Sequence, residues 1–256
     1  MAAGHRAMQQ GDFEGAARRF RGVAEAHPDE PGPWMSLGEA EMAAERYERA
    51  RAAFEHVVQL RPSSATPRIM VGHTYELQRM YDEALLAYHG ACEAAPESPQ
   101  AFRVIGTRLL RWGRPVEAIP FLERALAIAP THQETRNALA MARYHAGDLE
   151  GAEAEFRGTI AEHPDFLGAR VGLAAMLVNA HRLEDALAAY DAIAASWPRF
   201  APAQVGRGIL LHELGRSEEA LAAFRRAVEV AQDPAPYLGR LAAYEALLAR
   251  SPAAPR

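Results

Sequence analysis

Ten histidines are the residues of this 256-residue chain that most readily suggest metal or acid–base chemistry. None lies in a His-Glu-x-x-His sequence, none pairs with a second histidine at i, i+4, and none clusters with cysteine. His27 and His163 each precede a proline, where a polar turn is expected. The spacing predicts structural or surface histidines, with no metal and no cofactor.

The other residue types that do chemistry are dispersed as well. Cys92 is the only cysteine, so a disulfide or Cys-x-x-Cys pair is excluded, and its place on an expected helix predicts a buried, inert thiol. No Gly-x-Gly-x-x-Gly, P-loop or Gly-x-Ser-x-Gly sequence occurs; Gly147 and Gly215 are interpreted as turns. Carboxylates such as Glu153 and Glu155 are expected to solvate a helix surface. The sequence predicts that the chain is not an enzyme.

Composition limits the class of protein further. Hydrophobic residues make up 49% and charged residues 24% of the chain, which is enough apolar material for folding. No apolar run reaches the roughly 18 residues that cross a bilayer, and residues 1–10 lack a secretory signal. The net charge of −5 gives no basic field for nucleic acid. We therefore expect a cytoplasmic protein with neither nucleic-acid nor membrane partners. All 28 basic residues are arginine, as a GC-rich bacterial-like genome would favour.

The elements that must position these residues follow a period of 34 residues. An alanine recurs at this spacing without insertion or deletion: Ala16, Ala50, Ala84, Ala118, Ala152, Ala186 and Ala220. Proline follows each of the first six alanines by twelve residues: Pro28, Pro62, Pro96, Pro130, Pro164 and Pro198. Two residue types in one phase indicate an internal repeat.

Two further columns share the period. One is large and apolar: Phe20, Phe54, Tyr88, Leu122, Phe156, Tyr190 and Phe224. The other is small: Gly4, Gly38, Gly72, Gly106, Ala140, Ala174 and Gly208. In the repeat 65–98 the pattern predicts helices over about 66–77 and 82–94. Small residues allow the two helices to approach closely, and proline ends the second helix. Since a lone hairpin cannot bury its apolar faces, the repeats must stack.

The pattern resembles the tetratricopeptide repeat. The second repeat carries the residues of that motif in order: Trp34, Leu37, Gly38, Ala50, Phe54 and Pro62. The tyrosine of the motif is kept as Tyr75 in the third repeat, whereas Glu41 replaces it in the second. The resemblance implies an all-α, right-handed α-solenoid of antiparallel helix pairs. We expect one solenoid over residues 1–256 with these repeats: about 1–30, 31–64, 65–98, 99–132, 133–166, 167–200 and 201–234.

Three places where the sequence departs from the motif lead to separate structural predictions. The first helix of the first repeat is expected to be short, over about 2–10, and to leave an incomplete end to the stack. Pro120 falls inside an expected helix and should kink it. Residues 236–250 predict an amphipathic closing helix, followed by a loose tail over 251–256.

The resemblance also implies a ligand groove. In the family, first helices line the concave surface and ligands touch residues 2, 5, 9, 12 and 13 of each repeat. The candidate groove residues at these places are Met35, Met42, Ile69, His73, Glu76, Arg103, Arg111, Asn137, Met141, Tyr144, His145, Asn179 and His212. Arg103 and Arg111 are eight residues apart on one helix face, about 12 Å by helical rise, so they could clamp acidic side chains. Exposed, solvated arginines are the alternative interpretation.

The function expected from these residues is a protein-interaction scaffold that holds an extended peptide or a partner helix. The middle of the groove is predicted to prefer acidic segments with apolar flanks. One alternative is a substrate-recruiting domain of a larger modifying enzyme, such as a sulfotransferase, glycosyltransferase or hydroxylase. Another is a self-associating assembly module that uses the open first repeat.

Overall fold

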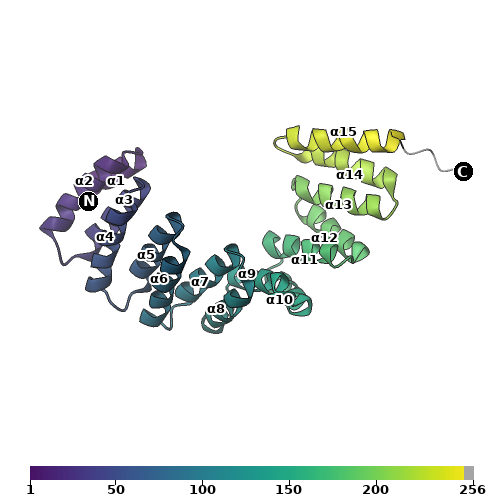
Figure 1. The fold of residues 1–256 in the computed structure, drawn as a ribbon. Coiled ribbons are helices and arrows are strands. Elements are labelled where there is room, and N and C mark those ends of the chain that lie inside the picture. The colour runs from purple at the N-terminus through teal and green to yellow at the C-terminus, as the bar shows by residue number, and fades with distance from the viewer. Residues whose placement is uncertain (251–256) are drawn as a thin grey trace, which may run out of the picture. The chain divides into compact units, whose positions relative to one another are not determined.

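The structure is a computed structural model that describes residues 1–250. The described part of the chain contains fifteen α-helices and no strand, and the two helices of a pair lie side by side (Figure 1). The first helices of the repeats are α1 Ala2–Gln9, α3 Pro31–Ala43, α5 Ala65–Leu77, α7 Pro99–Arg111, α9 Gln133–His145, α11 Leu167–Asn179 and α13 Ala201–Glu213. The second helices are α2 Phe13–Ala26, α4 Tyr47–Leu60, α6 Tyr81–Ala94, α8 Pro115–Ile128, α10 Leu149–Glu162, α12 Leu183–Ser196 and α14 Ser217–Val230. The closing helix is α15 Ala235–Arg250.

The helices confirm the all-α fold and the predicted helix pairs. In the third repeat α5 and α6 each begin one residue before the expected start, and α1 ends one residue earlier. Helix α8 continues through Pro120 without a break. The carbonyl that loses its bond to Pro120 belongs to Val116, which is exposed, so water can replace the missing donor. The tail predicted over 251–256 lies outside the described residues.

Two compact units divide the chain. The N-terminal unit is Met1–Ala138 and the C-terminal unit begins at Leu139, so the division falls within α9. In the C-terminal unit, Phe156, Leu173, Leu177 and Phe224 belong to one core cluster. Helix α15 packs against α14 and buries Tyr244 in this cluster, and so acts as a closing helix.

The alanine column forms the seam of each helix pair. All seven of its members have no exposed surface, and the large residue four positions later is almost fully buried in six of the seven repeats. An added Cβ at Gly38 would lie 2.4 Å from the ring of Phe54, and at Gly72 2.5 Å from Tyr88. Glycine is therefore required for the close crossing inside these pairs.

Two repeats of the C-terminal unit use other glycines for their large residues, whereas Phe224 packs on Gly208 of the small column. Where the small column carries Ala140 and Ala174, Phe156 packs instead on Gly172, and Tyr190 on Gly206. A Cβ at Gly172 would lie 2.4 Å from Phe156, and one at Gly206 2.6 Å from Tyr190. Both glycines belong to the first helix of the following repeat, so here the close approach joins neighbouring pairs.

The turn inside each pair has a left-handed residue at a period of 34. Its seven members are Gly11, Glu45, Arg79, Gly113, Gly147, His181 and Gly215, with φ between 55° and 88°. The next residue donates its backbone N–H to the carbonyl five residues earlier, as from Arg46 to Glu41 at 2.8 Å. This bond belongs to the Schellman ending of a helix, which favours glycine at the left-handed position.

The turn between repeats is closed by a side chain from the next repeat. In four repeats the carbonyl of the preceding terminal proline accepts a hydrogen bond from the fourth residue, which is Trp34 for Pro28 and an arginine in the other three. The arginines that do this are Arg68 to Pro62, Arg136 to Pro130 and Arg170 to Pro164. Phe102 has no donor at this place, and there Arg124 donates to the Pro96 carbonyl and lies over the Phe102 ring.

Candidate functional site

The apolar candidates of the N-terminal unit form one flank of the site. Met35 on α3 and Met42 at its end pack, partly buried, against Ala50, Phe54 and Val71. Ile69 on α5 is half-buried as well. Methionine side chains adapt to the shape of a ligand. These positions can therefore offer apolar contact without opening the core.

A charged cluster follows on α5 and α7. Glu76 accepts a hydrogen bond from Tyr88 Oη at 3.0 Å, and its Oε2 lies 3.0 Å from Arg108 Nε. Arg111 Nη1 lies 3.8 Å from Glu76 Oε1. The Glu76 side chain is 12% exposed and that of Arg111 is 67% exposed. The cluster thus has a largely buried base of Glu76, Tyr88 and Arg108, and one guanidinium, that of Arg111, which reaches solvent.

The pKa values of the cluster reflect its burial and charge. Burial, followed by the charge and hydrogen bond of Glu76, raises the pKa of Tyr88, so its hydroxyl stays protonated and donates. Burial also lowers the pKa of His73 on α5, and the charges of Arg108 and Arg111 lower it further, while Glu76 acts in the opposite direction. His73 is therefore neutral near pH 7, and the cluster of Arg108, Arg111 and Glu76 carries one net positive charge.

Arg103 lies at the other end of α7 from Arg111. It lines a small pocket of about 100 Å³ with Ala129, His132 and Thr135. A hydrogen bond with its own backbone is the main cause that lowers the pKa of Glu134, and the charge of Arg103 adds to the effect. The two arginines predicted as a clamp thus stand in different surroundings, because Arg111 already has Glu76 beside it.

The remaining candidates lie near α9, α11 and α13. Asn137, in the N-terminal unit, has a buried Oδ1 without a hydrogen-bond partner among residues 1–250. In the C-terminal unit Asn179 donates a hydrogen bond to Tyr144 Oη, and the Tyr144 ring lies 5.0 Å from the tilted ring of His145. Met141 packs against the core beside Tyr144. These candidates are therefore mostly neutral.

His212 on α13 is exposed and contacts the closing helix through Tyr244. Its Nδ1 lies 3.3 Å from Tyr244 Oη, and the two rings meet edge to face at 5.3 Å. This histidine therefore has a structural contact with α15 as well as an exposed edge.

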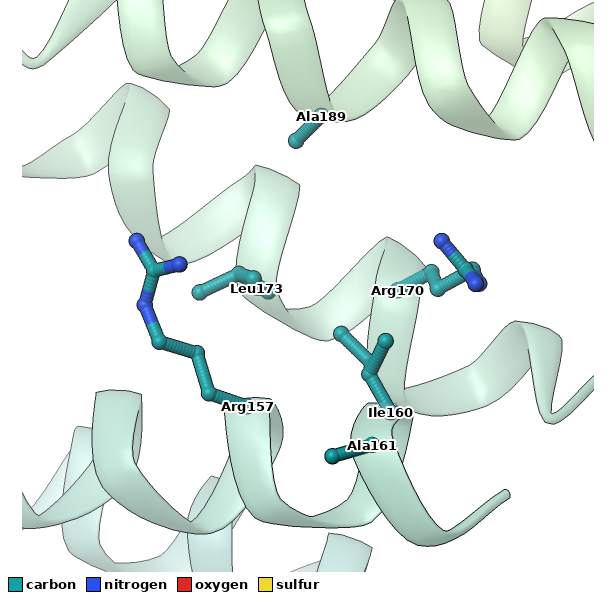
Figure 2. A pocket seen from close by; sticks show the side chains of 6 residues that line it. All are labelled: Arg157, Ile160, Ala161, Arg170, Leu173 and Ala189. Carbon is teal, nitrogen blue, oxygen red and sulfur yellow. The ribbon is translucent and has the colours of Figure 1, made fainter. Parts of the chain in front are cut away.

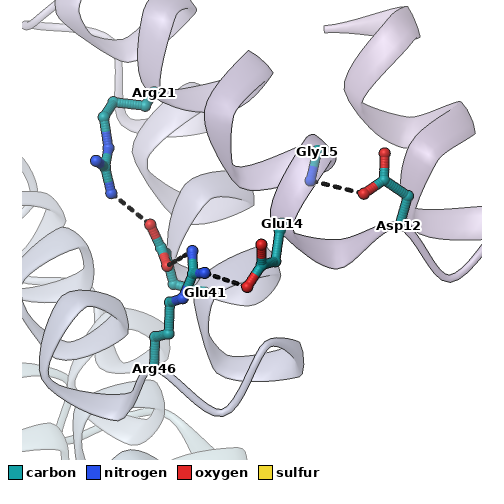
Figure 3. Close-up of polar contacts among 6 residues, drawn as sticks. All are labelled: Asp12, Glu14, Gly15, Arg21, Glu41 and Arg46. Carbon is teal, nitrogen blue, oxygen red and sulfur yellow. Dashed lines mark hydrogen bonds and ion pairs between the residues drawn. The ribbon is translucent and has the colours of Figure 1, made fainter.

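Glu41, which replaces the tyrosine of the motif, is a buried carboxylate with two arginine partners. Its side chain is 1% exposed and pairs with Arg21 from α2 and with Arg46 at the turn before α4 (Figure 3). Arg46 also pairs with Glu14 on α2. The departure from the motif is thus compensated by charges that include one from the preceding repeat, and Glu41 ties two repeats together.

Several residues that shape the candidate site were not predicted. Arg108 occupies the tenth place of its repeat, between two expected ligand positions, and Tyr88 was assigned only to the seam. Trp112 lies between Tyr81 and Tyr88, with ring centroids 5.1 and 6.3 Å away. The cluster around Glu76 depends on side chains from neighbouring repeats, so the spacing within one repeat carries no signal for it.

Two features bear on membrane and metal chemistry. No helix in the described part of the chain is long and apolar enough to cross a membrane. Within residues 1–250, no three histidine, cysteine or carboxylate side chains form a set that could hold a metal ion. Burial raises the pKa of the Cys92 thiol to about 11.

Several solved structures share the fold of this chain. The C-terminal part of a tetratricopeptide repeat protein from Cytophaga hutchinsonii superposes with a TM-score of 0.71 at 12% identity, over 89% of this chain and 93% of that one. PilW, a widely conserved type IV pilus biogenesis factor, gives 0.63 at 21% identity over 77% and 91%. A tetratricopeptide repeat protein from Parabacteroides merdae gives 0.62 at 16% identity over 94% and 96%.

Sequence models of the same family match most of the chain. One tetratricopeptide repeat model matches residues 1–65, 73–133 and 172–236, and a second matches 109–177. No curated protein sequence matches the chain. Since the family models cover well over half of the residues and the helix pairs repeat with the period of the motif, the chain belongs to the tetratricopeptide repeat family.

Proposed function

We propose that the face formed by α3, α5 and α7 binds a segment of a partner protein in which acidic residues are flanked by apolar ones. Tetratricopeptide repeat proteins are protein-interaction scaffolds. Their extended or helical ligands are recognised by side chains that project from a preformed surface. In this chain that surface has an apolar and a basic part in neighbouring helices.

The cluster of Glu76, Arg108 and Arg111 is the observation that carries the proposal. Glu76 and Tyr88 hold Arg108 in place, and Arg111 extends from the same site into solvent. One net positive charge in a half-buried site attracts a carboxylate despite the negative charge of the whole chain. Met35 and Met42 lie on the adjacent helix and provide contact for apolar side chains.

The test is a binding titration with a fluorescein-labelled peptide that carries two aspartates between leucines, beside a matched peptide with asparagines. The double variant Arg103→Glu, Arg111→Glu should weaken the aspartate peptide by about tenfold or more, which corresponds to about 1.4 kcal/mol. The salt dependence of binding should become flatter, because fewer charged contacts remain to be screened. Little change in melting temperature is expected, since the Arg111 side chain is 67% exposed.

Arg49→Glu is the matched control, because Arg49 is exposed on the second helix α4 and its reversal changes the net charge by the same amount per residue. It should leave binding unchanged. Single reversals then separate Arg111, beside Glu76, from Arg103, beside His132. Equal affinity of the parent and the double variant for the aspartate peptide would remove the site from α7.

A further inference from the structure

The C-terminal unit contains a second cavity that includes none of the groove candidates. It has a volume of about 260 Å³ and lies among α10, α11 and α12 (Figure 2). Its lining residues are Arg157, Ile160, Ala161, Arg170, Leu173 and Ala189. All three helices belong to one compact unit.

The floor of this cavity is apolar and fixed. Leu173 is part of the buried core, and Ile160 and Ala189 pack against the same core cluster. A floor built from core residues cannot rearrange without cost, so the cavity is preformed. Its volume lies below the about 300–1,000 Å³ of sites for drug-sized ligands, so it fits a single large side chain.

Two guanidinium groups border the floor, and they are not equivalent. Arg157 is neutralised by Glu153, whose carboxylate accepts a hydrogen bond from Arg157 Nε at 2.9 Å and also pairs with Arg182. Arg170 donates from Nε to the Pro164 carbonyl at 2.9 Å and lies over the Trp197 ring. Among residues 1–250 no carboxylate pairs with Arg170, so its two terminal nitrogens are available to an anion.

The distance between the charged group of Arg170 and the apolar floor of the cavity determines which kind of anion can bind. Arg170 and Leu173 are three residues apart on α11, so they are neighbours on one helix face, about 5–6 Å apart at Cβ. A ligand must therefore place a carboxylate and an apolar side chain close together. The last residue of a polypeptide does so, because both groups branch from one Cα.

We propose that this cavity binds the carboxy-terminal residue of a partner chain, with a leucine-sized side chain on the floor of Ile160, Leu173 and Ala189 and the α-carboxylate on Arg170. The site is separate from the face of α3, α5 and α7, so each proposal stands or fails by itself. With this second site, one chain would hold two segments of a partner, or two partners.

Methyl-detected NMR titration of the whole protein with N-acetyl-leucine tests the proposal, with N-acetyl-leucinamide as the matched probe that lacks the charge. The acid should shift the methyl signals of Ile160 and Leu173 and bind about tenfold more tightly than the amide, as loss of a charge-assisted contact implies. Arg170→Gln should abolish this preference. Ala189→Leu should fill the cavity and weaken both probes.

Arg68→Gln is the control for the structural role of Arg170. Arg68 has the same place in its repeat and donates to the Pro62 carbonyl, but it lies in the N-terminal unit. It should leave both probes unaffected. Equal binding of acid and amide, or shifts that survive Ala189→Leu, would overturn the proposal. Equal binding of a capped peptide with an internal Leu-Asp would overturn the assignment to a chain terminus.

Discussion

In the N-terminal unit, Gly38 and Gly72 give room to the large side chain of their own helix pair, whereas in the C-terminal unit Gly172 and Gly206 give room to Phe156 and Tyr190 from the preceding pair. The large column keeps its 34-residue phase in both regions, but its direction of close contact changes at Phe156 and Tyr190, while Phe224 keeps the contact within its own pair through Gly208. The same seam residue can thus tighten either a hairpin or the joint between two hairpins. A regular sequence period therefore does not imply identical packing in every repeat.

The largest expected effect tests what the two regions share. Ala118 and Ala152 have no exposed surface, so Ala118→Trp and Ala152→Trp should each overpack the seam and destabilise the fold by about 1–3 kcal/mol or more. Urea unfolding followed by circular dichroism measures the loss. If either variant unfolded like the parent, the alanine seam would not extend through both units.

Glycine substitutions test the difference in packing between Gly38, which tightens its own helix pair, and Gly172, which tightens the joint between two pairs. Gly38→Ala and Gly172→Ala each bring a Cβ to 2.4 Å from an aromatic ring and should cost about 1–3 kcal/mol. Amide hydrogen exchange should speed up in α3 and α4 for the first variant, and in α10 and α11 for the second. Gly158→Ala is the control on α10: nothing lies within 4 Å of its added Cβ, and a gain of about 0.5–1 kcal/mol is expected. Identical exchange patterns in the two test variants would contradict the change of direction.

The left-handed turns give a smaller effect with opposite signs. Gly147→Ala places a Cβ at φ 88° and should cost roughly 1 kcal/mol, while Arg79→Gly, at φ 61°, should gain up to about 1 kcal/mol. Thermal melting of both variants checks the signs. A stabilising Gly147→Ala would show that the turn can relax out of the left-handed region.

The last contrast lies in the first helices, since α5 and α7 carry a charged cluster and α9 and α11 a Tyr144–Asn179 hydrogen bond. The pKa of His73 is lowered in the fold, so below pH of about 6.5 the unfolded chain takes up a proton that the folded chain does not. Stability should fall as pH drops from about 7 toward 5.5, and His73→Gln should lose less over that range. Parallel pH profiles of the parent and the variant would remove His73 from this balance.

The sequence predicted the helix pairs, the seam and the closing helix because each depends on residue type at a fixed period. It could not reveal Gly172 and Gly206, which lie two positions before the small column and occur only twice. Nor could it reveal the contact of Glu76 with Arg108, because long side chains from different repeats meet only after the repeats have stacked. The left-handed turns could be predicted only in part. Glycine indicates four of them, but Arg79 and two other residues adopt the same conformation although their residue types do not predict it.

The bond to the carbonyls of five terminal prolines, from Pro28 to Pro164, limits how freely repeats can be exchanged. The donor belongs to one repeat and the acceptor to the one before it, so a transplanted repeat brings only half of the joint. A repeat copied from 99–132 must carry Arg124 together with Phe102, whereas one copied from 65–98 needs only Arg68. For recombination of this chain, the suitable unit is therefore a pair of adjacent repeats whose ends are cut within a helix pair. A cut at a terminal proline would separate the proline carbonyl from the side chain that donates to it.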